Sequence, residues 1–154
     1  MIRKSSIIVV ALAALAAGVG IAEAAGSADD AILARQAEMK ANNKAMGALV
    51  SILKGETPYD PATVKAAADQ IAAATAAADA ANAWDASAQT GTVKTLAKPE
   101  VWTDAANFAA AREKLAAAVT AVAATTDQAS FKQAFMQLGG ACKSCHETYR
   151  MPEN

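Results

Sequence analysis

Two cysteines and a histidine stand together near the C-terminal end of the chain, as Cys142-Lys143-Ser144-Cys145-His146. C-x-x-C-H is the spacing by which c-type haem is attached to protein. In this chemistry the two thiols add across the vinyl groups of the porphyrin, and the histidine gives an axial nitrogen to iron. On a helix, Cys142 and Cys145 share a face because they are three residues apart. The motif predicts one covalent haem c, with His146 as the proximal iron ligand.

Three other chemistries use cysteines at this spacing. A zinc site needs about four ligands, whereas the whole chain has two cysteines and one histidine. A thioredoxin-like redox pair normally follows a strand and starts a helix, but these cysteines come late in a helical pattern. A plain disulfide leaves the adjacent histidine without a role. Haem attachment therefore explains more of the motif than any of the three.

The first 24 residues have the pattern of an export signal. Arg3 and Lys4 precede an apolar run over 7–22, and Ala22-Glu23-Ala24 has the small-x-small pattern of a cleavage site. We expect residues 1–24 to be removed, leaving one mature domain of residues 25–154 in the periplasm. No other stretch is long and apolar enough to span a bilayer, so no membrane span is expected in the mature chain.

The composition of this mature domain indicates which partners and cofactors suit it. It keeps 12 basic and 14 acidic residues, a formal charge of −2 with His146 neutral, which argues against nucleic acid as a partner. Its length suits a single domain. The chain is rich in alanine and has few large apolar side chains, so a bulky apolar cofactor would fill an otherwise thin core.

Helical patterns follow one another along the whole mature chain. Helices are expected over 29–54 and 61–83, from Pro99 to the threonines at 125 and 126, and from a cap at Thr126 or Asp127 through the haem motif. Asp60 is expected to cap the second helix, with Pro61 as its first residue. Residues 84–96 show no period and are expected to form the long connection.

Apolar residues at helical spacing form a seam on the first and on the last of these helices. The seam expected on the first consists of Ile32, Met39, Met46, Val50 and Leu53. The seam expected on the last consists of Phe131, Phe135, Leu138, Cys142, Cys145 and Tyr149. We therefore predict an all-α fold, an antiparallel four-helix bundle with haem bound near the C-terminal helix.

Three segments resemble the class II c-type cytochromes, which comprise cytochrome c′ and cytochrome c-556. They are GACKSCHETYR at 140–150, KGETPYD at 54–60 and KPEVW at 98–102. The resemblance covers essentially the whole mature chain, and its C-terminal segment is the most specific part. It implies a four-helix haem protein that carries electrons or binds a gas, and it does not imply an enzyme.

The second axial position of the iron separates these two functions. No second histidine exists, and Met39 lies on the first-helix seam, where the resemblance places the helix face toward iron. The resemblance implies that cytochrome c-556 has a ligating methionine at this position. In cytochrome c′ the position usually holds an apolar side chain that does not bind the iron. Met46 is two turns further on, about 10 Å along the axis, and is expected in the core. We expect Met39 to be the distal ligand.

Other residues are assigned to the haem environment. The resemblance places Arg35 near the haem edge, as in cytochrome c′. Arg150 suits a haem propionate because a planar guanidinium matches a carboxylate, although a solvated arginine at a helix end is an equal alternative. Tyr149 is expected to pack on the haem or in the core.

The expected function is that of a periplasmic monohaem electron carrier of the cytochrome c-556 type, with His146 and Met39 as axial ligands. The alternative is a five-coordinate cytochrome c′ that binds nitric oxide or carbon monoxide. Redox proteins of unknown identity are the expected partners. The resemblance also implies a possible homodimer through the first two helices.

Overall fold

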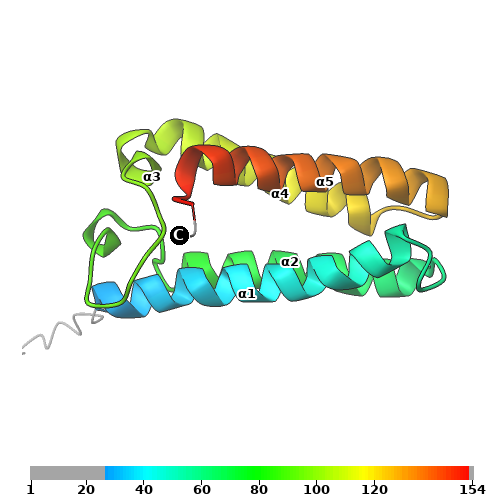
Figure 1. Ribbon diagram of the computed structural model, residues 1–154, viewed down its shortest axis with the longest axis horizontal. Coiled ribbons are helices and arrows are strands. Elements are labelled where there is room, and N and C mark those ends of the chain that lie inside the picture. Colours follow the sequence, from blue (N-terminus) through cyan, green and yellow to red (C-terminus); the bar gives the residue numbers. More distant parts are fainter. Residues whose placement is uncertain (1–26, 153–154) are drawn as a thin grey trace, which may run out of the picture.

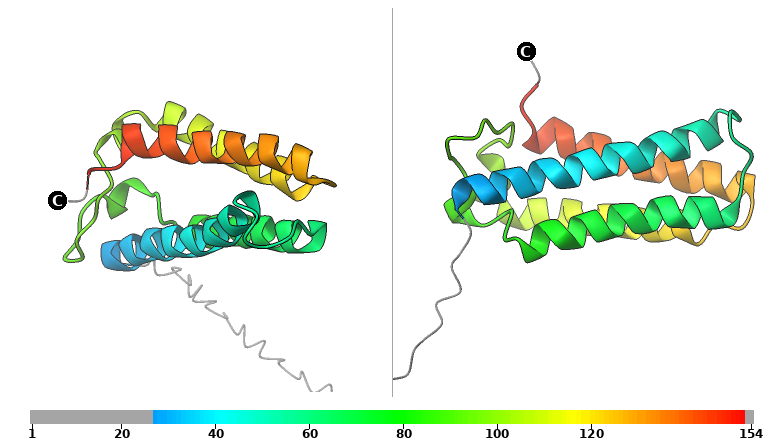
Figure 2. Two further views of the ribbon diagram at one scale, coloured as in Figure 1. Left: turned by 45° about the vertical axis from the view of Figure 1, so that its right-hand side comes forward. Right: turned by 90° about the horizontal axis from the view of Figure 1, so that it is seen from below.

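The computed structural model describes residues 27–152, and the expected export signal at 1–24 lies outside the described residues. Four long helices form an antiparallel bundle: α1 (Ala28–Leu53), α2 (Pro61–Ala80), α4 (Ala105–Ala123) and α5 (Gln128–Tyr149). Helices α1 and α2 make one layer, and α4 and α5 make the other (Figures 1 and 2). Helix α2 packs against α4 across the layers. The predicted all-α four-helix bundle is therefore confirmed.

Side-chain caps explain where three of the helices begin. Ser27 and Asp30 form a capping box at the start of α1. Asp60 accepts a hydrogen bond from the backbone N–H of Thr63, 2.8 Å away, and Pro61 is the first residue of α2. Asp127 caps α5 through the N–H of Ser130, also at 2.8 Å. The caps predicted at Asp60 and Asp127 are confirmed, and each satisfies a backbone donor that a helix leaves unpaired.

The helix predicted from Pro99 is in fact two helices. A short helix α3 (Glu100–Thr103) precedes α4, and Asp104 separates them with φ −120° and ψ 44°. The side chain of Asp104 accepts hydrogen bonds from Asn107 Nδ2 (2.8 Å) and from Tyr149 Oη (3.3 Å). This residue therefore anchors the end of α5, and the helix breaks where that anchor forms.

The long connection between α2 and α3 folds back over the start of α1. It follows α2 at Ala81 and contains a short 3₁₀ helix, η1 (Ala86–Ala88). Asp29 accepts hydrogen bonds from Thr92 Oγ1 and, at 3.0 Å, from the N–H of Val93. Gly91 is packed so closely that a Cβ there would collide with the Asp29 carboxylate and lie 3.0 Å from Ile32 Cδ1.

Each end of the bundle is tied across its two layers. At one end, Tyr59 Oη donates to the carbonyl oxygen of Thr125 at 2.9 Å, which joins the α1–α2 loop to the α4–α5 loop. At the other end, the backbone of 96–98 runs beside the end of α5. There the N–H of Lys98 donates to Tyr149 O (2.9 Å), and the N–H of Met151 donates to Leu96 O (2.8 Å). The last turn of α5 is therefore held in place by the long connection.

The apolar interior consists of two clusters rather than one. The main cluster contains Ala45, Leu49, Ile52, Val64, Ala67, Ala68, Ile71, Ala118, Val119, Val122, Phe131, Ala134, Phe135 and Leu138. The end cluster contains Val101, Phe108 and Tyr149, with Trp84, Ala97, Trp102, Ala111 and Cys145 packed against them. The end cluster lies where α5 finishes, and the main cluster fills the rest of the bundle.

The buried face of α1 differs from the seam predicted for it. Its buried residues are Ala31, Ile32, Arg35, Glu38, Ala45, Leu49 and Ile52. Met39, Met46, Val50 and Leu53 are only partly buried. The prediction followed the largest apolar side chains, whereas α1 packs against the alanine-rich α2, where small residues bring two helices close. It also did not allow for paired charged residues on the buried face of a helix.

Replacing Gly91 by alanine should lower the free energy of unfolding by about 1 to 3 kcal/mol, the usual cost of forcing extra atoms into a packed site. The added methyl group would displace the Asp29 carboxylate from Thr92 and Val93. Urea-induced unfolding measures the change. Gly47→Ala is the matched control, because nothing lies within 4 Å of a Cβ at that α1 position. Equal stability of the Gly91 variant and the wild type would contradict the packing described here.

Candidate haem site

The boundary between the two clusters lies at one level on α4 and α5. On α4, Ala111 packs against the end cluster, and Leu115, one turn later, packs against the main cluster. On α5, Cys145 packs against the end cluster and Cys142 packs against the main cluster. The boundary therefore passes Arg112 on α4 and runs between the two thiols on α5.

Charged and polar side chains from three helices are connected at this boundary. Glu38 Oε1 on α1 accepts hydrogen bonds from Thr75 Oγ1 on α2 (3.1 Å) and from Arg112 Nη1 on α4 (3.4 Å). Arg112 Nη2 pairs with Asp79 Oδ1 on α2 at 2.5 Å. We call Glu38, Thr75, Asp79 and Arg112 the polar band. It lies at the boundary between the apolar clusters, because Arg112 falls between Ala111 and Leu115 on α4.

Burial differs sharply along the polar band. The side chain of Glu38 is 0% exposed, that of Arg112 16% and that of Asp79 56%. Burial raises the pKa of Glu38, and the charge of Arg112 and the hydrogen bond from Thr75 act against that rise. The interior end of the band is therefore a buried ion pair, which is costly to break because one charge would be left unpaired.

Three buried polar atoms near the band have no hydrogen-bond partner within residues 27–152: Glu38 Oε2, Asn42 Oδ1 and Trp84 Nε1. Asn42 follows Glu38 by one turn of α1, and the Trp84 ring lies 5.1 Å from the guanidinium carbon of Arg112. A buried polar atom without a partner costs about 1 to 3 kcal/mol. Three such atoms in one region mark it as a place where a bound group or ordered water would supply the missing hydrogen bonds.

Both thiols lie on α5 at the level of this region. Cys142 and Cys145 are free and half-buried. Burial raises the pKa of both thiols. The charge of Arg112 lowers the pKa of Cys145, while the charges of Cys142 and Glu38 raise it. The buried ion pair is therefore close enough to the Cys145 sulfur to act on it electrostatically.

His146 follows the thiols but lies on a more open part of the α5 surface. Its side chain is exposed, and its backbone carbonyl accepts a hydrogen bond from the N–H of Arg150 at 3.0 Å. Partial desolvation, followed by the charge of Arg150, lowers the pKa of His146. The neutral imidazole favoured in this way is the form that binds a metal.

Met39 is next to Glu38 on α1, at the level of the polar band. It is half-buried and belongs to neither apolar cluster. Met46 packs against the main cluster, as predicted. Met136 and Met151 are 69% and 39% exposed. Of these four methionines, Met39 is the one that is half-buried and packs against neither cluster.

Arg35 is buried beside the same region and supports the long connection. It is 4% exposed, and its guanidinium donates to the carbonyl oxygens of Ala83 (2.5 Å) and Ala88 (2.9 Å). The guanidinium carbon also lies 5.6 Å from the Trp84 ring centroid and 5.4 Å from that of Trp102. Burial lowers the pKa of Arg35. Arg35 thus holds both tryptophans against the end cluster.

Tyr149 and Arg150 finish α5. Tyr149 is buried in the end cluster, and its ring meets that of Phe108 edge-on at 5.1 Å. Phe108 in turn contacts Trp84, with ring centroids 5.0 Å apart. Arg150 forms the C-cap of α5 and an isolated antiparallel bridge with Ala97. These aromatic rings give one side of the site a firm apolar wall.

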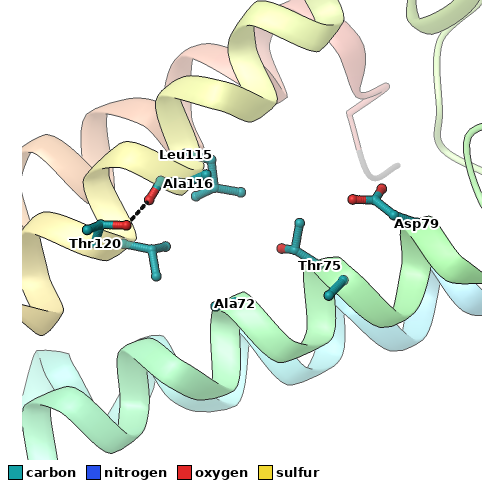
Figure 3. Close-up of a pocket in the computed structure, with 8 residues that line it drawn as sticks. Ala72, Thr75, Asp79, Leu115, Ala116 and Thr120 are labelled. Atoms are coloured by element: carbon teal, nitrogen blue, oxygen red, sulfur yellow. Dashed lines mark hydrogen bonds between the residues drawn. The ribbon is translucent and has the colours of Figure 1, made fainter.

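A cavity of about 220 Å³ lies between α2 and α4. Its lining is Ala72, Thr75, Ala76, Asp79, Leu115, Ala116, Val119 and Thr120 (Figure 3). It shares Thr75 and Asp79 with the polar band but contains neither thiol. The cavity is therefore on the α2–α4 side of the band, away from the position where a cofactor would be attached.

The residues at the boundary fit a covalently held porphyrin. The two clusters provide apolar walls, the thiols lie between them, and the three unpaired polar atoms are available to polar edges of a bound group. Sequence reasoning missed Glu38, Arg112 and Trp84. The available clue was that Glu38 follows Ile32 and Arg35 at helical spacing, on the face that proved to be buried.

Comparison with known proteins agrees with this geometry. The sequence model of a family described as Cytochrome C′ matches residues 30–150. Cytochrome c-556 from Agrobacterium fabrum is 39% identical over 119 residues, covering 76% of this chain and 78% of that protein. The crystal structure of cytochrome c′ from Rubrivivax gelatinosus has a TM-score of 0.72 and 32% identity, covering 80% and 97% of the two chains.

A second similar structure contains a gas ligand. It is the nitric oxide complex of a single-residue variant of cytochrome c′ from Alcaligenes xylosoxidans, with a TM-score of 0.72 and 28% identity. That comparison covers 82% of this chain and 98% of the other. Family model, curated relatives and solved structures all agree. The chain belongs to the cytochrome c′ family, the class II c-type cytochromes, which are haem proteins that carry electrons or bind gases.

Proposed function

We propose that this protein is a monohaem c-type cytochrome, with one haem c bound through thioethers to Cys142 and Cys145 and with His146 as the proximal ligand. The single observation that carries the proposal is the position of the two thiols, which stand on either side of the boundary between the apolar clusters. The bound haem supplies a one-electron iron couple. The chain holds the group, orients it and excludes water from it.

We further propose that Met39 is the distal ligand and that the protein is a low-spin electron carrier of the cytochrome c-556 type. A methionine thioether is a soft ligand that raises the reduction potential relative to a second nitrogen. The place of Met39 outside both clusters supports this role, because a methionine that only fills the core would pack as Met46 does.

The alternative is a five-coordinate haem that binds nitric oxide or carbon monoxide. Nitric oxide complexes of the similar cytochrome c′ from Alcaligenes xylosoxidans favour it. In this alternative the thioether of Met39 would face the iron without bonding it. The two functions therefore differ in a single bond, which spectroscopy reports directly.

We also propose a cellular setting for either function. Residues 1–24 would direct export to the periplasm and be removed, leaving a mature domain of 25–154. Between residues 27 and 152, no helix is long and apolar enough to cross a membrane. The partners would be redox proteins rather than nucleic acid or a substrate. A homodimer would form through α1 and α2, where Leu33 is 50% exposed on α1.

Carbon monoxide distinguishes the two functions. We expect the reduced wild-type protein to keep its low-spin absorption spectrum when carbon monoxide is added, because Met39 occupies the second axial position. Met39→Ala should become high-spin and bind the gas rapidly. Met46→Ala is the control, since Met46 packs in the main cluster. Rapid conversion of the wild-type spectrum would support the gas-binding alternative.

Removal of one thiol should leave one vinyl group of the porphyrin unsaturated. We expect Cys145→Ser to shift the α-band of the reduced pyridine haemochrome to longer wavelength, and the double Cys142→Ser, Cys145→Ser variant to release all its haem in acidified organic solvent. Ser144→Ala is the control, because Ser144 is exposed between the two cysteines. An unchanged band position in the Cys145 variant would rule out a thioether at that residue.

A further inference from the structure

The polar band places a charge pair inside the protein that haem attachment does not require. The Glu38 side chain is fully buried, and its partner Arg112 is 16% exposed. Thioether formation uses only the cysteines, and axial ligation uses His146 and the distal group. The buried pair is therefore not needed to attach the haem, and we ask instead which property of the bound haem it would change.

The pair is also linked to the position where the haem would be held. Arg112 lies on α4 between Ala111 and Leu115, at the boundary between the two clusters, and Cys145, a proposed attachment residue, packs beside that boundary on α5. Arg112 stacks on the ring of Trp84, which packs against the same end cluster as Cys145. Electrostatic interactions here are strong because the interior has a low dielectric constant and salt screens buried charges poorly.

The charges of the pair are held apart and only partly compensated. Glu38 Oε1 faces Arg112 and Thr75, whereas Oε2 has no hydrogen-bond partner among the described residues. Arg112 is drawn toward Asp79, which pairs with it at 2.5 Å while the contact with Glu38 is 3.4 Å. A haem beside this arrangement would experience a buried anion and a buried cation at separate positions.

We propose that Glu38 and Arg112 set the reduction potential of the haem in opposite directions, the carboxylate lowering it and the guanidinium raising it. The proposal rests on the proposed function, because it needs a haem attached at Cys145. Reduction adds one electron to the ferric haem and so removes one positive charge from it. A buried anion stabilises the more positive ferric state, and a buried cation stabilises the ferrous state.

Spectroelectrochemical titration of the holoprotein tests the proposal. Glu38→Gln should raise the reduction potential and Arg112→Gln should lower it, each by up to about tenfold in the equilibrium constant, or about 59 mV for one electron. Glu113→Gln is the matched control, because it removes a carboxylate from the exposed face next to Arg112. Its potential should stay close to that of the wild type.

The opposite signs separate an electrostatic role from a structural one. If the pair only supported packing, both variants would let water reach the haem and shift the potential in the same direction. Shifts of equal sign, or no shift in either variant, would overturn the proposal. A wild-type protein without any haem couple would instead overturn the proposed function, so the two failures are distinguishable.

A double variant covers the case in which one single variant does not fold. Glu38→Gln combined with Arg112→Gln removes both charges and leaves amides that can hydrogen-bond. Its potential should return toward that of the wild type and lie above that of Arg112→Gln alone. That comparison measures the contribution of Glu38 even without the single Glu38 variant, and a double variant no higher than Arg112→Gln would contradict the proposal.

Discussion

The interruption of the apolar interior by one buried ion pair is the constraint on which the site depends. Glu38 and Arg112 cannot be absorbed into either apolar cluster, because separating them or burying one alone would leave an uncompensated charge. The main cluster and the end cluster therefore meet at the same level on α4 and α5. The two thiols of α5 stand on either side of that level, which is where we propose that the haem is attached.

Contacts elsewhere in the fold keep the helices aligned with one another at this level. Tyr59 ties the two layers together at the far end, and Asp104 and the segment 96–98 hold the end of α5 at the near end. Arg35 adds two hydrogen bonds to the long connection and stacks on both tryptophans. These polar contacts thus fix the positions of the helices relative to one another. They matter here because the alanine-rich helices have few large side chains that could interlock.

The fold could be predicted, and the attachment motif could be recognised, because both depend on residues that are local in sequence. Asp60 and Asp127 indicate where helices start, because each caps a backbone N–H three residues further on. The two cysteines and His146 lie within five consecutive residues. The break at Asp104 could not be predicted, since it serves a hydrogen bond to Tyr149, 45 residues away. Glu38 and Arg112 were missed for the same reason: each looks like a surface charge until its partner, 74 residues distant, is known.

The central claim is that the boundary between the clusters holds one haem bound covalently through α5. The most direct test is the intact mass of protein made in a host with a haem-attachment system, measured under denaturing conditions that remove any non-covalent ligand. The account predicts the mass of the polypeptide from Ala25 to Asn154 plus that of a single haem. A mass equal to that of the polypeptide alone would contradict it.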